Sequence, residues 1–163
     1  MQKKALVIID IQNDITKNYK DIIANINKAI DWAVVNNIHV IYIRHENISA
    51  GTRTFKPDTH GSELVPDMKI VSNNIFTKIK ANALSCAEFS DFIKKNELCD
   101  FYIAGADAVV CVKSTCYNLC KENYSVNVLS DCITSYDKRK INEMLQYYES
   151  KGCKIISLKD LLM

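Results

Sequence analysis

The sequence predicts an α/β domain, a three-layer α-β-α sandwich around a mainly parallel central sheet of five to six strands. Short apolar runs of strand length, most clearly residues 5–9 and 38–43, are typical of strands that are buried on both faces. They alternate with longer segments in which apolar residues recur every three to four positions, as on one face of a helix. Such alternation favours a parallel sheet with right-handed crossovers.

The first strand is predicted at residues 5–9, Ala-Leu-Val-Ile-Ile, and it ends at Asp10. A helix is expected over residues 19–36, because five apolar residues recur there at helical spacing: Ile22, Ile26, Ala29, Ile30 and Ala33. Residues 38–43 form the second predicted strand. The next stretch, 45–74, holds both prolines and two of the four glycines, which predicts a long loop of the kind that often carries function.

A short strand is predicted at residues 75–78, and a helix follows over 86–97, with Phe89, Phe92 and Ile93 facing inward. Residues 100–105 form the next strand, which ends in glycine. Four further elements complete the chain before a short C-terminal turn: a helix over 111–123, a strand over 125–130 ending at Asp131, a helix over 138–150 and a strand over 153–157.

Composition and charge exclude several classes of protein. The chain is 48% hydrophobic and 25% charged, which is average for globular domains and excludes disordered and collagen-like chains. A net charge of +2 gives no electrostatic basis for binding nucleic acid or an anionic membrane. The apolar run before Asp10 is too short for a signal peptide or a membrane span, so we expect a cytoplasmic protein. No linker or repeat interrupts the chain, and we expect one domain over residues 1–163.

The seven cysteines are unusual for a chain of this length: Cys86, Cys99, Cys111, Cys116, Cys120, Cys132 and Cys153. An odd number excludes complete pairing, and thiols in a reducing cytosol are the default. No C-x-x-C pair occurs, which disfavours a metal cluster. We therefore expect most of them, Cys116 included, to be small buried hydrophobic residues.

Three candidate functional residues lie where predicted strands end: Asp10, Lys78 and, after the turn at 105–110, Cys111. In parallel sheets, ligands bind at the carboxyl ends of the strands. A helix start would lower the pKa of the Cys111 thiol, and a nearby Lys78 ammonium would lower it further. Asp10 could accept the thiol proton and return it to a leaving amine. These positions predict a cysteine hydrolase.

A family resemblance rests on four stretches that occur in order along nearly the whole chain: Ala5–Asp14, Lys78–Phe89, Gly105–Thr115 and Val126–Asp131, the last followed by Gly152. The first contains Asp-x-Gln-Asn-Asp, and the third contains Cys-Val-x-x-Thr. Together they resemble the motifs of the isochorismatase-like cysteine hydrolases, a superfamily that includes nicotinamidases, N-carbamoylsarcosine amidohydrolases and isochorismatases.

The resemblance implies a Rossmann-like fold, no cofactor, and Asp10, Lys78 and Cys111 as the catalytic triad. It also implies a non-proline cis peptide between Ala106 and Asp107, with the backbone N–H groups of Asp107 and Cys111 forming the oxyanion hole. In the implied mechanism the Cys111 thiolate attacks an amide-like carbonyl, Asp10 passes its proton to the departing nitrogen, and water hydrolyses the thioester.

The sequence departs from the family pattern at two places. Asn82-Ala83-Leu84 replaces Ser-Ala-Phe, and Ala108-Val109 replaces the Thr-Asp that often precede the cysteine. The Asp-x-His…His metal set of nicotinamidases is not matched at His45, although His60 follows in the loop, so we expect no metal. The candidate substrate pocket comprises five residues: Gln12, His45, Asn82, Leu84 and Ala108.

These observations predict hydrolysis of an amide or carbamoyl C–N bond in a small molecule. Two alternatives stay open, which are isochorismatase-type vinyl-ether hydrolysis and a non-catalytic redox-sensing or binding relative that uses Cys111 as a low-pKa thiol. Retention of Cys111 argues against the first, because vinyl-ether hydrolysis can dispense with the thiol. We expect a homo-oligomer, either a dimer or a tetramer, that binds neither nucleic acid nor membrane.

Overall fold

The computed structural model describes residues 3–16 and 20–163. Six strands form one sheet in the order β3-β2-β1-β4-β5-β6, and every neighbouring pair is parallel. Their bounds are β1 (Lys4–Ile9), β2 (His39–His45), β3 (Ile75–Lys78), β4 (Asp100–Gly105), β5 (Ser125–Ile133) and β6 (Lys154–Ile156). The predicted α/β class with a parallel sheet is confirmed.

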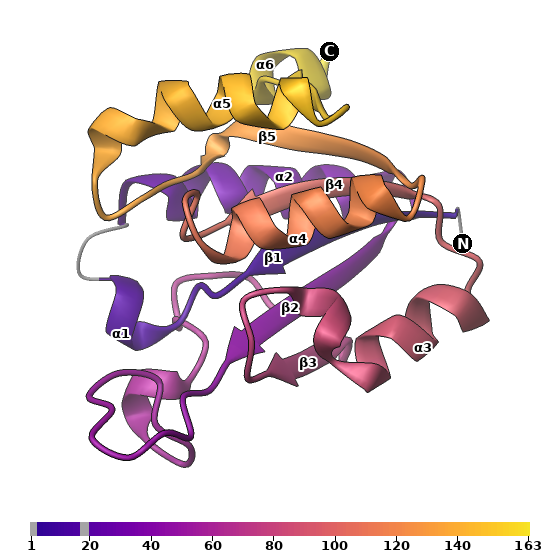
Figure 1. Cartoon of the computed structure of the whole chain (residues 1–163). Coiled ribbons are helices and arrows are strands. Elements are labelled where there is room, and N and C mark those ends of the chain that lie inside the picture. The colour runs from indigo at the N-terminus through magenta and orange to yellow at the C-terminus, as the bar shows by residue number, and fades with distance from the viewer. Residues whose placement is uncertain (1–2, 17–19) are drawn as a thin grey trace.

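Helices cover both faces of this sheet (Figure 1). One face carries α2 (Ile23–Val35) and α6 (Leu158–Leu162), and the other carries α3 (Ala87–Lys95), α4 (Cys111–Lys121) and α5 (Ile141–Ser150). The short helix α1 (Asn13–Thr16) follows β1. Single 3-10 turns complete the set: η1 (Lys20–Ile22), η2 (His60–Ser62), η3 (Ala83–Ser85) and η4 (Lys138–Lys140). None of the helices in the described part of the chain is long and apolar enough to cross a membrane.

The apolar run of β1 is explained by burial on two sides. Val7 and Ile9 belong to the core under α3, α4 and α5, whereas Leu6 and Ile8 belong to the core under α2. Successive side chains of a strand point to opposite faces, so a central strand covered by two helix layers has no position left for a polar residue. After Lys4, which is half-buried at the start of β1, the next polar residue is Asp10, and it appears only where the strand has ended.

Several element boundaries differ from the prediction. The strand expected over 38–43 continues to His45, and the helices expected to end at 97 and 123 end at Lys95 and Lys121. The helix expected over 19–36 begins with the 3-10 turn at Lys20, and residue 19 lies outside the described residues. The strand expected to end at Asp131 continues to Ile133, because a register shift in the pairing with β4 brings Ile133 opposite Gly105. The expected C-terminal turn is the helix α6, whose N-cap Ser157 accepts a hydrogen bond from the N–H of Asp160.

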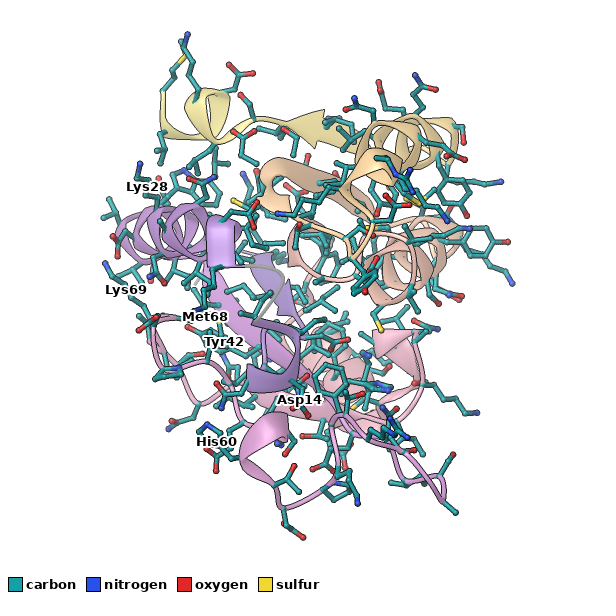
Figure 2. The ribbon with its side chains drawn as sticks, turned by 90° about the vertical axis from the view of Figure 1, so that its left-hand side faces the viewer. Asp14, Lys28, Tyr42, His60, Met68 and Lys69 are labelled. Carbon is teal, nitrogen blue, oxygen red and sulfur yellow. The ribbon has the colours of Figure 1, made fainter. Side chains whose placement is uncertain are left out.

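The long loop after β2 is anchored to the body of the domain at several points. The hydroxyl of Tyr42 donates to the carbonyl of Lys69 at 2.7 Å, and Gln12 forms an isolated bridge with Leu64. Asp14 accepts a hydrogen bond from the N–H of Phe55, and Figure 2 shows Asp14 on α1 near the η2 turn. These contacts hold the loop against the carboxyl ends of β1 and β2.

Candidate active site

Asp10 is held in one position by the backbone around it. It follows β1 directly, with a left-handed φ of 57°, and its N–H donates to the carbonyl of Ile43 at 2.9 Å. A left-handed conformation lets the chain leave the strand abruptly. The carboxylate is buried, and Oδ2 lies 3.2 Å from Nζ of Lys78. The other oxygen, Oδ1, accepts no hydrogen bond within the described residues.

The amine of Lys78 is the centre of the site. Lys78 is the last residue of β3, and its side chain is fully buried. Its Nζ lies 3.2 Å from Oδ2 of Asp10, 3.3 Å from Sγ of Cys111 and 3.0 Å from Nδ1 of His45. An ammonium has three protons to donate, and each of these three atoms can accept one. The structure thus brings the three residues of the predicted triad together.

The turn before Cys111 is built by a close approach of backbones. Gly105 has a φ of 120°, and a Cβ there would stand 2.1 Å from the carbonyl oxygen of Ile9. Only glycine fits such a position. The next peptide, Ala106–Asp107, is cis, and the N–H of Ala106 donates to the carbonyl of Ile9 at 2.9 Å. The turn that leads to Cys111 is therefore bonded to the strand that leads to Asp10.

Asp107 supports this turn with its own side chain. Its Oδ1 accepts from the N–H of Val109 at 2.8 Å, and its Oδ2 accepts from the N–H of Tyr136 at 2.9 Å. Its carbonyl accepts from Val110 and Val112, so the chain enters α4 with Cys111 as the first helical residue.

The expectation of a lowered Cys111 pKa is wrong. Burial, and then the negative charge of Asp10, raise the pKa of the Cys111 thiol to about 12, and Lys78 only partly opposes them. The prediction counted the helix start and the lysine, but Asp10 lies beside the same lysine and cancels much of its charge. The pKa of Asp10 is raised as well, mainly by burial. In the resting site the proton therefore stays on sulfur, next to a carboxylate that can accept it.

His45 is a partner of Lys78, which the sequence did not reveal. Because the lysine can only donate, Nδ1 of His45 accepts, and its Nε2 carries the proton that is donated to Oδ1 of Asn47 at 2.7 Å. Burial and the charge of Lys78 lower the pKa of His45, which keeps the ring neutral. The strand register explains the contact: β2 pairs with β3 so that His45 lies opposite Lys78. The predicted strand ended at residue 43 and so did not include His45.

Among the described residues, one group has donor atoms close enough to hold a metal ion: Asp10, His45 and Cys111, whose ligand atoms lie within 4.8 Å of one another. The amine of Lys78, however, lies within hydrogen-bonding distance of all three. It occupies the position that an ion would need, so these residues do not fit a metal. His60 is highly exposed and pairs with Glu63 instead.

The other candidate pocket residues have structural contacts. Gln12 is buried and bonds the backbone of His45 in both directions and the carbonyl of Ser62. Asn82 caps η3 by accepting from the N–H of Leu84. Leu84 lines a depression of about 240 Å³ whose walls include none of the triad. Ala108 is buried, and its N–H donates to the carbonyl of Thr134.

Two positioning contacts were absent from the prediction. Thr115, on α4, accepts a hydrogen bond from the N–H of Ala83 at 3.0 Å, which ties the helix of Cys111 to the segment after Lys78. The hydroxyl of Tyr148 donates to the carbonyl of Ala108 in the turn. Thr115 was visible in the Cys-Val-x-x-Thr motif, but nothing in the sequence signalled Tyr148.

Comparison with known proteins identifies the family. The model of the isochorismatase domain matches residues 4–160, nearly the whole chain. The chain belongs to the isochorismatase family. A curated relative, the uncharacterized isochorismatase family protein YrdC of Bacillus subtilis strain 168, is 25% identical over 167 residues, covering 98% of this chain and 88% of the relative.

Solved structures share the isochorismatase-family fold at low identity. The pyrazinamidase of Pyrococcus horikoshii in complex with zinc superposes with a TM-score of 0.87 at 20% identity, covering 96% of this chain and 99% of that chain. Nicotinamidase PncA from Bacillus subtilis gives 0.82 at 15% identity, covering 94% and 98%. The cysteine hydrolase from Pseudomonas syringae pv. phaseolicola 1448A gives 0.88 at 16% identity, covering 98% and 91%. The predicted superfamily is confirmed, and the protein is an isochorismatase-family hydrolase.

Proposed function

We propose that this protein hydrolyses a C–N bond of a small amide or carbamoyl compound through a thioester on Cys111. The proposal is supported by one juxtaposition: Nζ of the buried Lys78 lies 3.2 Å from Oδ2 of Asp10 and 3.3 Å from Sγ of Cys111. A nucleophile and a base on either side of one fixed cation match the requirements of covalent acyl transfer. Two of the structural relatives, a pyrazinamidase and a nicotinamidase, point to amides as the substrate class.

The first step moves the thiol proton to Asp10 as Sγ attacks the carbonyl carbon. Because the pKa of Cys111 is raised to about 12, attack and proton transfer have to occur together. The new oxyanion accepts hydrogen bonds from the backbone N–H groups of Asp107 and Cys111, at the positive end of α4. Lys78 stays bound to both reacting residues and keeps them aligned.

The second step releases the amine. Asp10 returns the proton to the leaving nitrogen, the C–N bond breaks, and an acyl thioester remains on Cys111. A water molecule then gives a proton to Asp10 and attacks the thioester carbon. The acid product departs as Asp10 returns that proton to the sulfur, which restores the resting site.

Ammonia release from a panel of primary amides and ureido compounds, including nicotinamide and pyrazinamide, tests the function. We expect turnover that survives EDTA, a loss of at least about 10³-fold in kcat for Cys111→Ala, and an acyl adduct on Cys111 by mass spectrometry. Cys99→Ala, which removes an exposed thiol, is the control and retains turnover. Hydrolysis of vinyl ethers that persists in Cys111→Ala would overturn the proposal in favour of isochorismatase-type chemistry.

The alternative of a low-pKa sensor thiol at Cys111 is disfavoured by the raised pKa of that thiol. The expected cytoplasmic location and the homo-oligomer, dimer or tetramer, stay predictions. Size-exclusion chromatography with light scattering tests the second.

A further inference from the structure

Three cysteines gather away from the triad, between the far end of α4 and the start of β6. Cys116 and Cys120 are four residues apart on one face of α4. Cys153 directly precedes β6, and its Sγ lies 3.2 Å from Sγ of Cys120. Cys116 and Cys153 are buried, whereas Cys120 is partly exposed. The sequence predicts most of its cysteines, Cys116 included, as small buried hydrophobic residues and gives no indication of this cluster.

The backbone holds Cys153 in place beside α4. Its N–H donates to the carbonyl of Tyr148 at 3.0 Å, and the preceding Gly152 turns the chain out of α5 with a φ of 100°. A disulfide needs its sulfurs about 2.05 Å apart. From the observed 3.2 Å, the two sulfurs need to approach by only about 1.2 Å for the bond to form.

The charge state of these thiols suits oxidation. Hydrogen bonds from the thiols of Cys116 and Cys120 lower the pKa of Cys153 to about 7, against the opposing effect of burial. The pKa of Cys120 is raised to about 12, mainly by burial. At neutral pH Cys153 is therefore more readily deprotonated than Cys120 or the proposed nucleophile Cys111, whose pKa is also raised to about 12.

We propose that Cys120 and Cys153 form a reversible disulfide on reaction with hydrogen peroxide, a modification site separate from the triad. The Cys153 thiolate attacks a peroxide oxygen, the O–O bond breaks, and a sulfenic acid and hydroxide form, the hydroxide taking a proton to become water. The Cys120 sulfur then attacks the Cys153 sulfur, the S–O bond breaks, and a second water leaves with the Cys120 proton. Two thiols have lost two electrons and one peroxide has gained them, and a dithiol reverses the change by thiol–disulfide exchange.

The disulfide leaves the triad intact. Cys120 lies nine residues after Cys111, about 13 Å along the helix axis at about 1.5 Å per residue. The bond joins two residues that are 33 positions apart in the chain. Closing a loop of that size restricts the unfolded chain, which shifts the unfolding equilibrium toward the folded state by roughly two to three orders of magnitude.

The test uses the full reduced chain, treated with a small excess of hydrogen peroxide at pH 7. We expect two of the seven thiols to be lost, one crosslinked peptide pair containing Cys120 and Cys153, recovery of both thiols with dithiothreitol, and a higher midpoint of thermal unfolding. Amidase turnover stays within about twofold. A first linkage through Cys99, Cys111 or Cys116, or loss of turnover before the crosslink forms, overturns the proposal.

Variants test the order of the two steps. Cys120→Ser should accumulate a sulfenic acid on Cys153 that a dimedone probe labels, whereas Cys153→Ser should give no label at residue 120. Cys99→Ser, which removes an exposed thiol elsewhere, is the matched control and forms the crosslink as the wild type does. Circular dichroism verifies that each variant folds. Dimedone labelling of Cys120 in Cys153→Ser contradicts the assignment of Cys153 as the attacking thiol.

Discussion

Replacing Asp10 with asparagine should separate the acidity of Cys111 from its ability to turn over substrate. In the wild type, Oδ2 of Asp10 lies 3.2 Å from Nζ of Lys78, and after burial the negative charge of Asp10 is the largest cause that raises the pKa of Cys111. The substitution removes that charge and leaves the ammonium beside the sulfur. The thiol should therefore become more acidic in Asp10→Asn, although the variant has lost its base.

The size of the effect follows from the distance between the Asp10 carboxylate and Sγ of Cys111, which lie within 4.8 Å of each other. Two unit charges at that distance interact by about 3.5 kcal/mol at an effective dielectric constant of about 20. At about 1.36 kcal/mol per tenfold change, removing this repulsion raises the thiolate population by roughly two to three orders of magnitude. We expect alkylation of Cys111 at pH 7.5 to accelerate at least about tenfold, while kcat falls by about 10² to 10⁴ because proton transfer is lost.

The assay is the rate of iodoacetamide labelling at Cys111, followed by peptide mass spectrometry, beside the rate of ammonia release. Asp31→Asn is the matched control, because Asp31 is exposed and pairs only with Lys69 at the surface. Removing Asp10 leaves Lys78 buried beside fewer partners, so both rates are read at a temperature where circular dichroism shows a folded variant. Labelling that is unchanged or slower in folded Asp10→Asn would refute the electrostatic reasoning.

Three further predictions concern stability. Burial lowers the pKa of His45 below its ordinary 6.5. As the pH falls through 6.5 the unfolded chain therefore binds more protons than the folded one, and the free energy of unfolding drops. The urea midpoints at pH 7.5 and 5.5 should differ more in the wild type than in His45→Gln. Gly105→Ala should lower the free energy of unfolding by at least about 3 kcal/mol, because the new Cβ would collide with the backbone of β1. Gly51 also has a left-handed φ but open space around it, so Gly51→Ala should lower the free energy of unfolding by only about 1 kcal/mol in the same urea denaturation. Equal costs for both glycine variants would contradict this. Tyr148→Phe removes the hydroxyl that donates to the carbonyl of Ala108 and should lower the free energy of unfolding by about 1 to 3 kcal/mol. An unchanged urea midpoint would show that this hydrogen bond contributes nothing to stability.

The positions of the triad residues were predictable because they depend on a rule of parallel sheets. The residues that follow or end such strands lie at one edge of the sheet, so Asp10 and Lys78 had to approach the turn before Cys111 once the strand assignments were right. Each assignment needed only local information, namely an apolar run and the first polar residue after it. The element boundaries that were wrong, such as the end of β5, depended on register with a neighbouring strand.

The charge states of the site were not predictable in the same way. They depend on the distances between side-chain atoms of residues 10, 45, 78 and 111. Those distances are set by how the side chains pack in the folded chain. A helix start and a lysine pointed to an acidic thiol, but the carboxylate that shares the lysine reversed the direction. The partner of His45 was hidden for the same reason, because a loop histidine in sequence is a strand residue opposite Lys78 in the structure.

The pKa values of Cys111 and Cys153 are shifted in opposite directions because the neighbours of the two thiols differ in charge. Cys111 is buried beside a carboxylate that competes for the same ammonium, so losing its proton would place two anions around one cation. Cys153 is buried beside two neutral thiols, which stabilise its thiolate by donating hydrogen bonds and impose no negative charge. A nucleophile that keeps its proton until substrate arrives is poorly reactive toward peroxide, whereas a standing thiolate is readily oxidised. We therefore expect oxidation at Cys153, the more acidic thiol, and attack on a carbonyl by Cys111, the thiol beside a base.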